Sequence, residues 1–527
     1  VLLVGIILAL PVIIAILVLF QVHRQIVAQL LAIKYGSSFR GLLQGSDVVW
    51  AGQERSSKAV ASVLLLFEKP VHVSDDSVHL LELFRDRFKR LHTVDAYQKL
   101  FWQRRIQWGY YFWIKQELPL WSDRYVKQLD VIPSSSSCLS KRQLCALIGS
   151  ISNRDCNGTS WELLVGRQPL CHDDSTVMLY PVRAQSLVVS FAIVLVVMFA
   201  LKVLFRYHHS IADGIAIFRT FCKEFLDSTG TAEEHVWNPN AANQTSVKGF
   251  FTWRNLFRMA YRGPRFLAHE ILLKRECNPF YGPEPSNNKI VCWAGDHAGR
   301  PANHATPAIS AIKTVKHLVN DCSFTDILLT AFATSLGAYC RRKRLPVPTT
   351  VTIGQMRRFH RESEVIQLRN RSTAVFKTLP IGSLPCGSST IDQLICQINA
   401  VKGPDDAFQA STDALITHLS VSYLPELLPA AVVRALFARS KFSIALSNIP
   451  AFVGTVSLER YILREATFWV PNIERNLFGL TLLTTDGRLQ IGSIADRTII
   501  KDEEELEQIL NETLQELSNM ACMIKCN

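Results

Sequence analysis

Residues Ser186 to Gly214 read SLVVSFAIVLVVMFALKVLFRYHHSIADG, an apolar run that ends in two adjacent histidines and an Asp-Gly pair. The part up to Phe205 is dense in valine, leucine, isoleucine and phenylalanine, which is typical of a buried β-strand. Beyond the Asp-Gly pair, apolar residues recur at the spacing of one helical face: Ile215, Phe218, Cys222 and Phe225. The stretch therefore predicts a strand, a loop that carries the two histidines, and a helix.

The loop between this strand and helix holds His208, His209, Asp213 and Gly214. Imidazole titrates near neutral pH, so a histidine on such a loop is suited to take a proton from a hydroxyl and return it later. Asp213 is then expected to orient the loop, and Gly214 to permit a tight turn. Two other interpretations stay open at this point. The histidines form a structural pair, or they form a metal site with the aspartate, although no second cluster at ligand spacing accompanies them.

The apolar run Ser186–Phe205 is also long enough to be a second membrane span. Its β-branched content and its position directly before the histidines favour a strand. A span at this point would place the first half of the chain across the membrane from the histidine loop.

The N-terminal part of the sequence predicts a membrane anchor. Residues 1–20 carry no charge, and about 20 apolar residues match the thickness of a bilayer, whereas the apolar part of a signal peptide runs to about 7–15. Basic residues follow, with no acidic residue before Asp47: His23, Arg24, Lys34 and Arg40. This bias predicts a membrane protein, of the endoplasmic reticulum, whose catalytic lobes face the cytosol. Because the chain starts with valine, we expect further residues upstream.

Composition narrows the class of partner. The 527 residues, enough for about two to four domains, are 48% hydrophobic with a mean hydropathy of +0.14 and a formal charge of +12. No nucleic-acid-binding module accompanies that charge, so we expect a membrane surface and no nucleic acid. Between Lys248 and Arg275, basic residues alternate with aromatic ones, and Arg254, Arg258 and Arg262 share one helical face. Such a segment suits the lipid headgroup layer or a solvated connector between lobes.

Thirteen cysteines without a CxxC pair are most simply explained as reduced cytosolic thiols. Four of them lie close together in the sequence and would suit disulfides if this region were luminal: Cys138, Cys145, Cys156 and Cys171.

The remaining pattern predicts a mixed α/β chain in two lobes. We expect an N-terminal lobe over 25–230, a basic and aromatic connector over 231–300, and a C-terminal lobe over 301–527. Ser323 is expected to cap a helix over Thr325–Arg341, and Asp486-Gly487 to form a hairpin turn. Strands are expected at residues 60–67, 349–353, 374–379, 442–446, 477–484 and 489–494, and helices at 78–89 and after Asp502.

With these landmarks, the chain resembles the wax ester synthase/diacylglycerol acyltransferase family of CoA-dependent acyltransferases with an HHxxxDG motif. Besides the histidine loop, five segments resemble family segments in order and spacing: 45–50, 323–337, 368–380, 447–450 and 485–496. Three departures concern the choice of acyl acceptor. Thr325 stands where the family prefers asparagine, Ala451-Phe452 replaces Gly-Pro, and Pro169-Leu170-Cys171 stands near the position of its Pro-Leu-Trp.

The resemblance implies a two-lobed fold like that of chloramphenicol acetyltransferase, with the histidine loop at the centre of a tunnel. His209 is the implied general base, supported by His208, Asp213 and Gly214. Four further residues are candidates for the tunnel or for the structural framework: Asp326, Asn370, Asn448 and Pro450. No permanently bound cofactor and no metal is expected.

The implied reaction moves a fatty acyl group from acyl-CoA to a long-chain alcohol, giving a wax ester, or to diacylglycerol, giving triacylglycerol. Two alternatives are transfer of an acetyl or short-chain group to a smaller alcohol, and a catalytically silent lipid-binding membrane protein.

Overall fold

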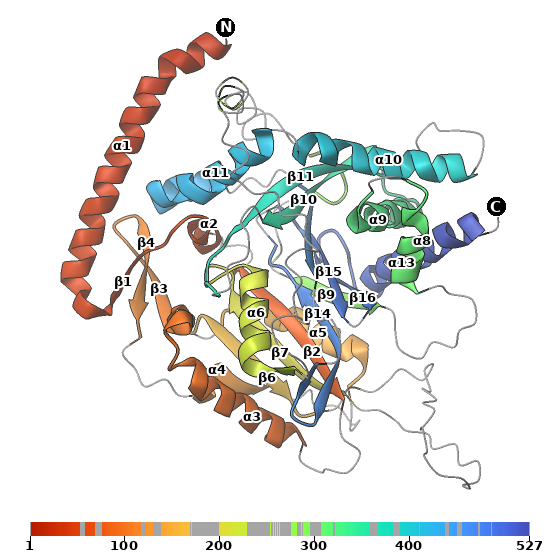
Figure 1. Cartoon of the computed structure of the whole chain (residues 1–527), viewed down its shortest axis with the longest axis horizontal. Coiled ribbons are helices and arrows are strands. Elements are labelled where there is room, and N and C mark those ends of the chain that lie inside the picture. Colours follow the sequence, from red (N-terminus) through yellow and green to blue (C-terminus); the bar gives the residue numbers. More distant parts are fainter. Residues whose placement is uncertain are drawn as a thin grey trace.

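The computed structural model describes residues 2–52, 58–68, 76–116, 122–129, 139–156, 158–168, 170, 200–228, 276–281, 286, 288–295, 307–319, 322–358, 366–382, 390–409, 412–437, 442–450, 456–472, 475–485 and 487–525, together with five helical residues between 253 and 263. Two mixed sheets and one small antiparallel sheet organise these residues (Figure 1).

The first sheet carries the strand that leads to the histidine loop. Its seven strands follow the order β5 (Val126–Leu129), β6 (Trp161–Gly166), β7 (Ala200–His208), β2 (Val60–Glu68), β14 (Tyr461–Trp469), β13 (Val456–Leu458) and β8 (Asp227–Ser228). Alternate residues of β2 enter two separate cores, since successive side chains of a strand point to opposite faces. Leu65 and Phe67 pack with α3 (Asp76–Leu91) and α6 (Gly214–Phe225), whereas Leu64 and Leu66 face the second lobe.

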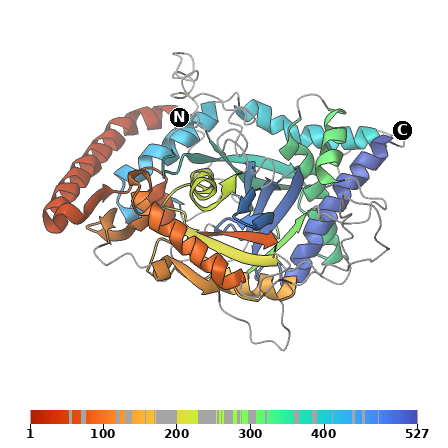
Figure 2. The ribbon, with the colours of Figure 1, turned by 60° about the horizontal axis from the view of Figure 1, so that its bottom comes forward.

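The second sheet has the order β11 (Ser372–Pro380), β10 (Thr350–Arg358), β12 (Ile444–Pro450), β15 (Phe478–Thr485), β16 (Arg488–Asp496) and β9 (Lys289–Gly295). Four helices gather around it: α8 (Ala308–Lys316), α9 (Phe324–Arg342), α10 (Thr390–Gln409) and α13 (Glu503–Lys525) (Figure 2). The lobes meet where α5 (Lys141–Ser152) packs on β9.

A third, smaller unit flanks the first lobe. It contains the sheet β1 (Phe39–Leu42), β4 (Tyr110–Lys115) and β3 (Trp102–Gln107), and the helices α1 (Leu2–Tyr35), α2 (Asp47–Gly52), α11 (Thr412–Leu427) and α12 (Ala430–Phe437). Short elements complete the chain: η1 (Gly36–Ser38), η2 (Asp95–Phe101) and α4 (Ser122–Tyr125). α1 runs along one edge of the molecule beside α11 (Figures 1 and 2).

Local signals in the sequence account for several of these boundaries. Ser323 caps α9 with Asp326 in a reciprocal capping box, as the sequence predicts. Thr485 pairs with Arg488, so two residues connect β15 and β16, and Gly487 has the positive φ (+71°) that a tight hairpin turn favours. The predicted helices at 78–89 and after Asp502 are confirmed as α3 and α13.

Three further sequence-based expectations can be compared with the structure. The described part of the strand before the histidines is β7, residues 200–208, and most of the predicted strand lies outside the described residues. The two sheets do not follow the predicted division at residue 301. β13 and β14 come from the C-terminal half but complete the first sheet, and β9, placed in the connector, is an edge strand of the second. α1 continues to Tyr35, well beyond the predicted anchor at 1–20.

The cysteines also depart in part from the expected reduced state. Eight described cysteines are free thiols, among them Cys145 and Cys156 of the clustered four, whereas Cys396 is disulfide-bonded.

Candidate active site at the histidine loop

The histidine loop lies at the junction of the two lobes. β7 ends at His208, and the backbone of the next residue is held by the first lobe, where His209 N donates to the carbonyl of Ala59 at 2.8 Å. From the second lobe, the segment just before β11 reaches the same loop, and Asp213 N donates to the carbonyl of Arg369 at 3.4 Å. The loop therefore takes its position from both halves of the chain.

His209 is a buried, neutral imidazole. Its ring is 9% exposed and stacks on the indole of Trp50, with 3.9 Å between ring centroids and 23° between the planes. Burial lowers the pKa of His209 to about 4, although Asp213, the carbonyl of His209 itself and Asn370 act in the opposite direction. The side chain is therefore uncharged at neutral pH and available as a proton acceptor.

His208 is committed to the structure of the loop. The backbone N–H of Ser210 donates to Nδ1 of His208 at 3.1 Å, and the Ser210 hydroxyl lies 2.8 Å from the same atom. Arg104 on β3 donates to that hydroxyl at 3.1 Å. Burial, with the positive charge of Arg104, lowers the pKa of His208 well below its usual value. These contacts make His208 a neutral framework residue.

Asp213 ties the loop to both α6 and β11. One carboxylate oxygen accepts from Ala216 N at 3.0 Å and so caps α6, while the other accepts from Arg371 N at 2.9 Å and from the Ser372 hydroxyl at 3.1 Å. Gly214 has no room for a side chain, because a Cβ there would stand 2.9 Å from Cδ1 of Ile449 on β12. Both residues hold the loop against the second lobe.

Asn370 joins the loop to a segment that sequence analysis matched only loosely, Gly45–Trp50. Its Nδ2 donates to the carbonyl of His209 at 2.7 Å and to Oδ1 of Asp47 at 2.8 Å. Asp47 in turn forms a buried ion pair with Lys99 at 2.7 Å. Neither Asp47 nor Trp50 was among the predicted site residues, although residues 45–50 resemble a family segment, and that resemblance was the signal that could have found them.

Asp326 and Asn448 come together at a different place, the start of α9. Asp326 forms a buried ion pair with Lys377 of β11 at 2.5 Å, and Nδ2 of Asn448 donates to the Thr325 hydroxyl at 3.3 Å. Pro450 lies at the end of β12, opposite Thr484 of β15. These contacts assign Asp326 to the framework that holds the second lobe together. Over the described part of the chain, no group of three or more His, Cys, Asp or Glu side chains is arranged to hold a metal ion.

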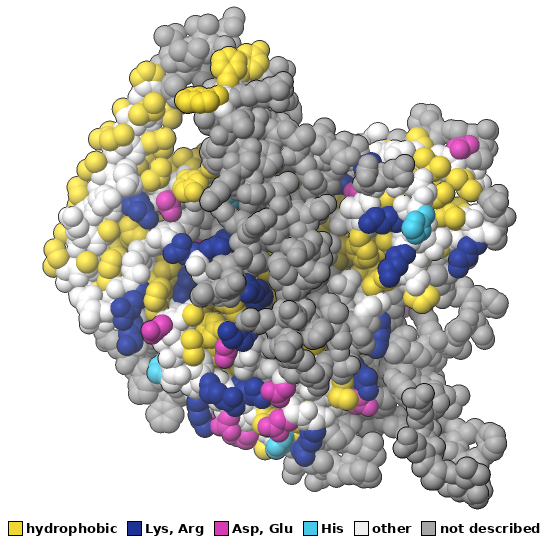
Figure 3. All heavy atoms as spheres, in the orientation of Figure 1, with side chains coloured by type: hydrophobic (Ala, Val, Ile, Leu, Met, Phe, Trp, Pro, Cys, Tyr) yellow, Lys and Arg dark blue, Asp and Glu magenta, His cyan; other side chains and the backbone are white. Residues whose placement is uncertain are grey.

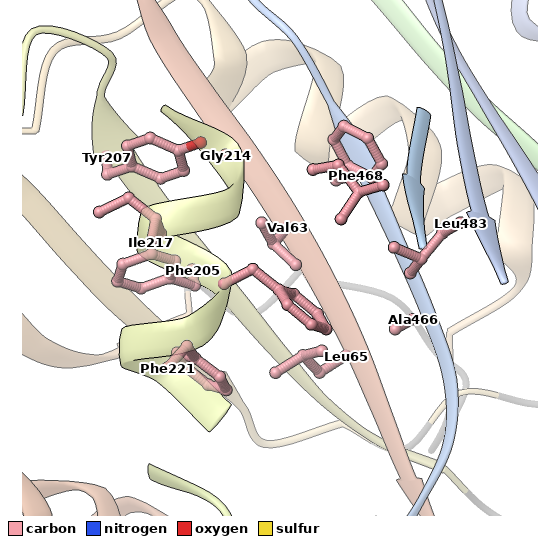
Figure 4. Close-up of a pocket in the computed structure, with 12 residues that line it drawn as sticks. Val63, Leu65, Phe205, Tyr207, Gly214, Ile217, Phe221, Ala466, Phe468 and Leu483 are labelled. Atoms are coloured by element: carbon pink, nitrogen blue, oxygen red, sulfur yellow. The ribbon is translucent and has the colours of Figure 1, made fainter. Parts of the chain in front are cut away.

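An apolar pocket opens beside the histidine loop (Figure 4). It begins at Tyr207 and Gly214 and is lined by α6, by β2 and β14 of the first sheet, and by residues from β12 and β15. The ring of Tyr207, which lines the pocket, lies 6.1 Å from that of His209, so the pocket is one residue away from the base. Its volume is about 30 Å³, which admits about two water-sized groups before side chains move. The arrangement suits an apolar group held close to a proton acceptor.

Residues 381–518 match the family model of the WS/DGAT C-terminal domain. This part of the chain is similar to the C-terminal domain of the WS/DGAT family. The resemblance found in the sequence is thereby confirmed, and family and fold together indicate an acyltransferase. Among curated proteins, no sequence matches the chain.

Two solved structures share the fold of the chain. The wax ester synthase/diacylglycerol acyltransferase from Marinobacter aquaeolei VT8 is 14% identical, with a TM-score of 0.57 over 91% of this chain and 100% of that one. A trichothecene 15-O-acetyltransferase from Fusarium sporotrichioides is 10% identical, with a TM-score of 0.57 over 91% of this chain and 95% of that one. The predicted two-lobed fold, like that of chloramphenicol acetyltransferase, is confirmed.

Proposed function

We propose that the chain transfers a fatty acyl group from acyl-CoA to the hydroxyl of a long-chain alcohol or of diacylglycerol, with His209 as general base. The observation that carries the proposal is the pairing of a neutral, buried His209 with an apolar pocket that begins at Tyr207 and Gly214. An apolar chain bound there would bring its reactive end near a histidine that is neutral, and so able to accept a proton, at neutral pH.

The reaction needs one base and no covalent enzyme intermediate. An alcohol hydroxyl is a poor nucleophile, and His209 would accept its proton as the oxygen attacks the thioester carbonyl. The tetrahedral intermediate then collapses, the carbon–sulfur bond breaks, and His209 returns the proton to the departing sulfur. The products are the ester and free CoA, and His209 is neutral again.

Basic residues beside the loop support an anionic acyl carrier such as CoA. Arg104 contacts Ser210, and the backbones of Arg369 and Arg371 contact Asp213, so three guanidinium-bearing residues belong to elements that hold the histidine loop. Arg369 is exposed. Arginine recognises phosphate through paired N–H donors, so these residues are candidates to meet the phosphate groups of CoA.

α1 supports the membrane part of the proposal. Residues Pro11–Ser38 are long and apolar enough to cross a bilayer, with a mean hydropathy of 1.8. Large hydrophobic side chains lie exposed along the helix (Figure 3): Val12, Ile13, Ile14, Ile16, Val18, Leu19, Val22, Ile26, Leu30 and Ile33. Its other face packs on the body of the protein through Leu17, Phe20, Val27 and Leu31. The helix would thus hold the catalytic lobes at a lipid surface, on the cytosolic side of the endoplasmic reticulum as the basic residues predict.

A second exposed apolar group lies near the same edge. Trp253, Phe257 and Tyr261 are helical, four residues apart, and 89%, 76% and 63% exposed. Two residues further on, a Cβ at Gly263 would stand 3.3 Å from Ile416 of α11, a helix that α1 also contacts. Tryptophan and tyrosine favour the headgroup region, so this helix is a candidate second contact with the bilayer. Its arginines lie outside the described residues.

One observation favours a second candidate reaction, the transfer of an acetyl or other short-chain group to a smaller alcohol. The pocket has a volume of about 30 Å³, so a long acyl chain would enter only if the surrounding side chains move. A short acyl group would need less rearrangement.

Membranes that contain the full chain test the proposal directly. Labelled palmitoyl-CoA is supplied with hexadecanol or with diacylglycerol, labelled acetyl-CoA with a short alcohol, and each pair is repeated with His209→Ala. The control is His317→Ala, an exposed histidine at the end of α8. We expect ester from palmitoyl-CoA, lost in His209→Ala and kept in the control. Ester formation by a folded His209→Ala protein would refute the base, and lipid binding without transfer would favour a silent binding protein.

A further inference from the structure

Trp50 covers one face of the His209 ring. The two rings are nearly parallel, their centroids are 3.9 Å apart, and the indole is only 8% exposed. Trp50 belongs to α2, a helix of six residues that lies far from the histidine loop in the sequence. This contact is closer than the one between His209 and Tyr207, whose ring centroids are 6.1 Å apart.

Among the residues that the structure describes, no carboxylate accepts a hydrogen bond from Nδ1 of the His209 ring. Among the described residues, Nδ1 of His209 is buried without a hydrogen-bond partner. Asp213, the acid of the motif, uses its oxygens for Ala216, Arg371 and Ser372. In many active sites an acid holds the imidazole of a base in place. Here the orientation of the ring depends on packing, and the flat surface that packs against it is the indole.

α2 is itself held firmly on several sides. Asp47 pairs with Lys99 and accepts from Asn370, and the backbone N–H of Gly45 donates to Glu426 of α11 at 3.0 Å. Gly45 has a φ of +52°, and a Cβ there would stand 2.9 Å from the carbonyl oxygen of Ser422, so this turn needs glycine.

The apolar side of α2 completes the attachment. Val48 and Ala51 pack into one cluster with β4 and α12, and Leu17 and Phe20 of α1 pack against that cluster. The indole therefore rests on a rigid platform that reaches from the histidine loop to the apolar helix.

We propose that Trp50 is a positioning residue for the base: its indole fixes the plane of the His209 imidazole, keeps water from that face, and stabilises the ring when it becomes positive. This inference rests on the proposed role of His209. Proton transfer from the hydroxyl turns imidazole into imidazolium, and an aromatic face attracts such a cation. A ring held in one orientation also meets the hydroxyl without first losing rotational freedom.

Charged groups around the base bear on any pH measurement. Asp213 faces His209, and His208 precedes it with Arg104 beyond. The pair Asp47–Lys99 lies on the far side of Asn370. All of them remain in a Trp50 variant, so a change in pH dependence would report on the indole.

Three variants separate positioning from simple packing. Trp50→Leu removes the aromatic face, Trp50→Phe keeps an aromatic face of smaller area, and Trp108→Leu changes a half-exposed tryptophan in the β3–β4 turn as a control. For Trp50→Leu we expect kcat to fall about 10- to 100-fold, part of the usual benefit of a placed base, with little change in KM for acyl-CoA. Trp50→Phe should recover most of kcat, and the control should match the unchanged chain.

A second measurement does not depend on turnover. Diethyl pyrocarbonate reacts with neutral imidazole, and mass spectrometry of the peptide that contains His209 follows its modification against pH. Loss of the indole opens the ring to water and to the reagent, so in Trp50→Leu we expect faster modification of His209, by about 10-fold.

The outcomes are distinct. Unchanged modification of His209 in folded Trp50→Leu overturns the proposal, as does a Trp50→Phe protein that loses as much kcat as Trp50→Leu. If the unchanged chain transfers no acyl group, the proposed function fails, while the modification experiment still decides whether Trp50 covers His209. Should Trp50→Leu not fold, Trp50→Phe and Trp50→Tyr provide the same comparison.

Discussion

The buried ion pair between Asp326 and Lys377 makes a sharp prediction about the second lobe. Asp326 lies in the first turn of α9 and Lys377 on β11, and both side chains are almost fully buried. Asp326 also accepts from the backbone N–H and hydroxyl of Ser323, each at 2.7 Å. The pair thus links a helix start to an edge strand of the second sheet.

Replacing Lys377 with methionine keeps the volume of the side chain. It leaves a buried carboxylate whose remaining side-chain partner, among the described residues, is Ser323. Removing one partner of a buried pair costs about 3–5 kcal/mol. Adding Asp326→Asn removes the remaining charge and keeps a group that can accept from Ser323. The double variant Asp326→Asn/Lys377→Met should therefore regain most of the lost free energy of unfolding, since neutral replacements of buried pairs are often tolerated.

Denaturant unfolding of the chain in its membrane or detergent measures these differences, with a probe in the second sheet such as the fluorescence of Trp293 on β9. Burial would raise the pKa of Asp326, but Lys377 and Ser323 together lower it below its usual value. A carboxyl whose pKa is lowered by folding stabilises the folded protein at pH values above the pKa that it has in the unfolded chain. The difference in unfolding free energy between the unchanged chain and Lys377→Met should therefore shrink below about pH 4. A cost under about 1 kcal/mol for Lys377→Met, or a double variant as unstable as the single, would refute the argument.

Three further predictions concern the active site. Burial lowers the pKa of His209 to about 4, so the rate of acyl transfer should rise with pH through about 4 and level off before neutrality. A midpoint of the pH–rate profile near 6.5 would contradict the burial of the ring. Ala466→Phe fills the pocket from β14, so it should slow transfer of long acyl chains more than of acetyl, measured as the ratio of kcat/KM; an unchanged ratio would place the acyl chain elsewhere. Gly214→Ala forces a Cβ to 2.9 Å from Ile449 and should cost about 1–3 kcal/mol by denaturant unfolding, with Ile449→Val restoring part of the loss; no rescue would assign the cost to the backbone.

Local sequence patterns predicted many elements correctly. Ser323 marked the start of α9 as its cap, and Asp486-Gly487 marked the hairpin between β15 and β16. The histidine loop was correctly placed between a strand and a helix. These features depend on hydrogen bonds and dihedral angles within a few residues, so the nearby sequence is enough to predict them.

Contacts between distant segments were missed. β14 was not predicted, and it pairs with β2, which lies almost 400 residues earlier in the chain. Trp50 and Asp47 were not predicted as site residues either, although they meet His209 and Asn370. Such contacts arise when two lobes pack, and no periodicity within one segment reports them.

The sequence alone determined the parts of this protein that act locally: an apolar N-terminal helix, two lobes of mixed sheet, and a histidine loop whose second histidine is suited to be a base. Only the tertiary structure decided how that base is held. His209 is neutral because two lobes bury it, its loop is fixed because Asn370 and Asp213 bond across the lobes, and its ring is oriented by the indole of Trp50. Burial and stacking depend on which surfaces meet, and that is settled when the whole chain folds.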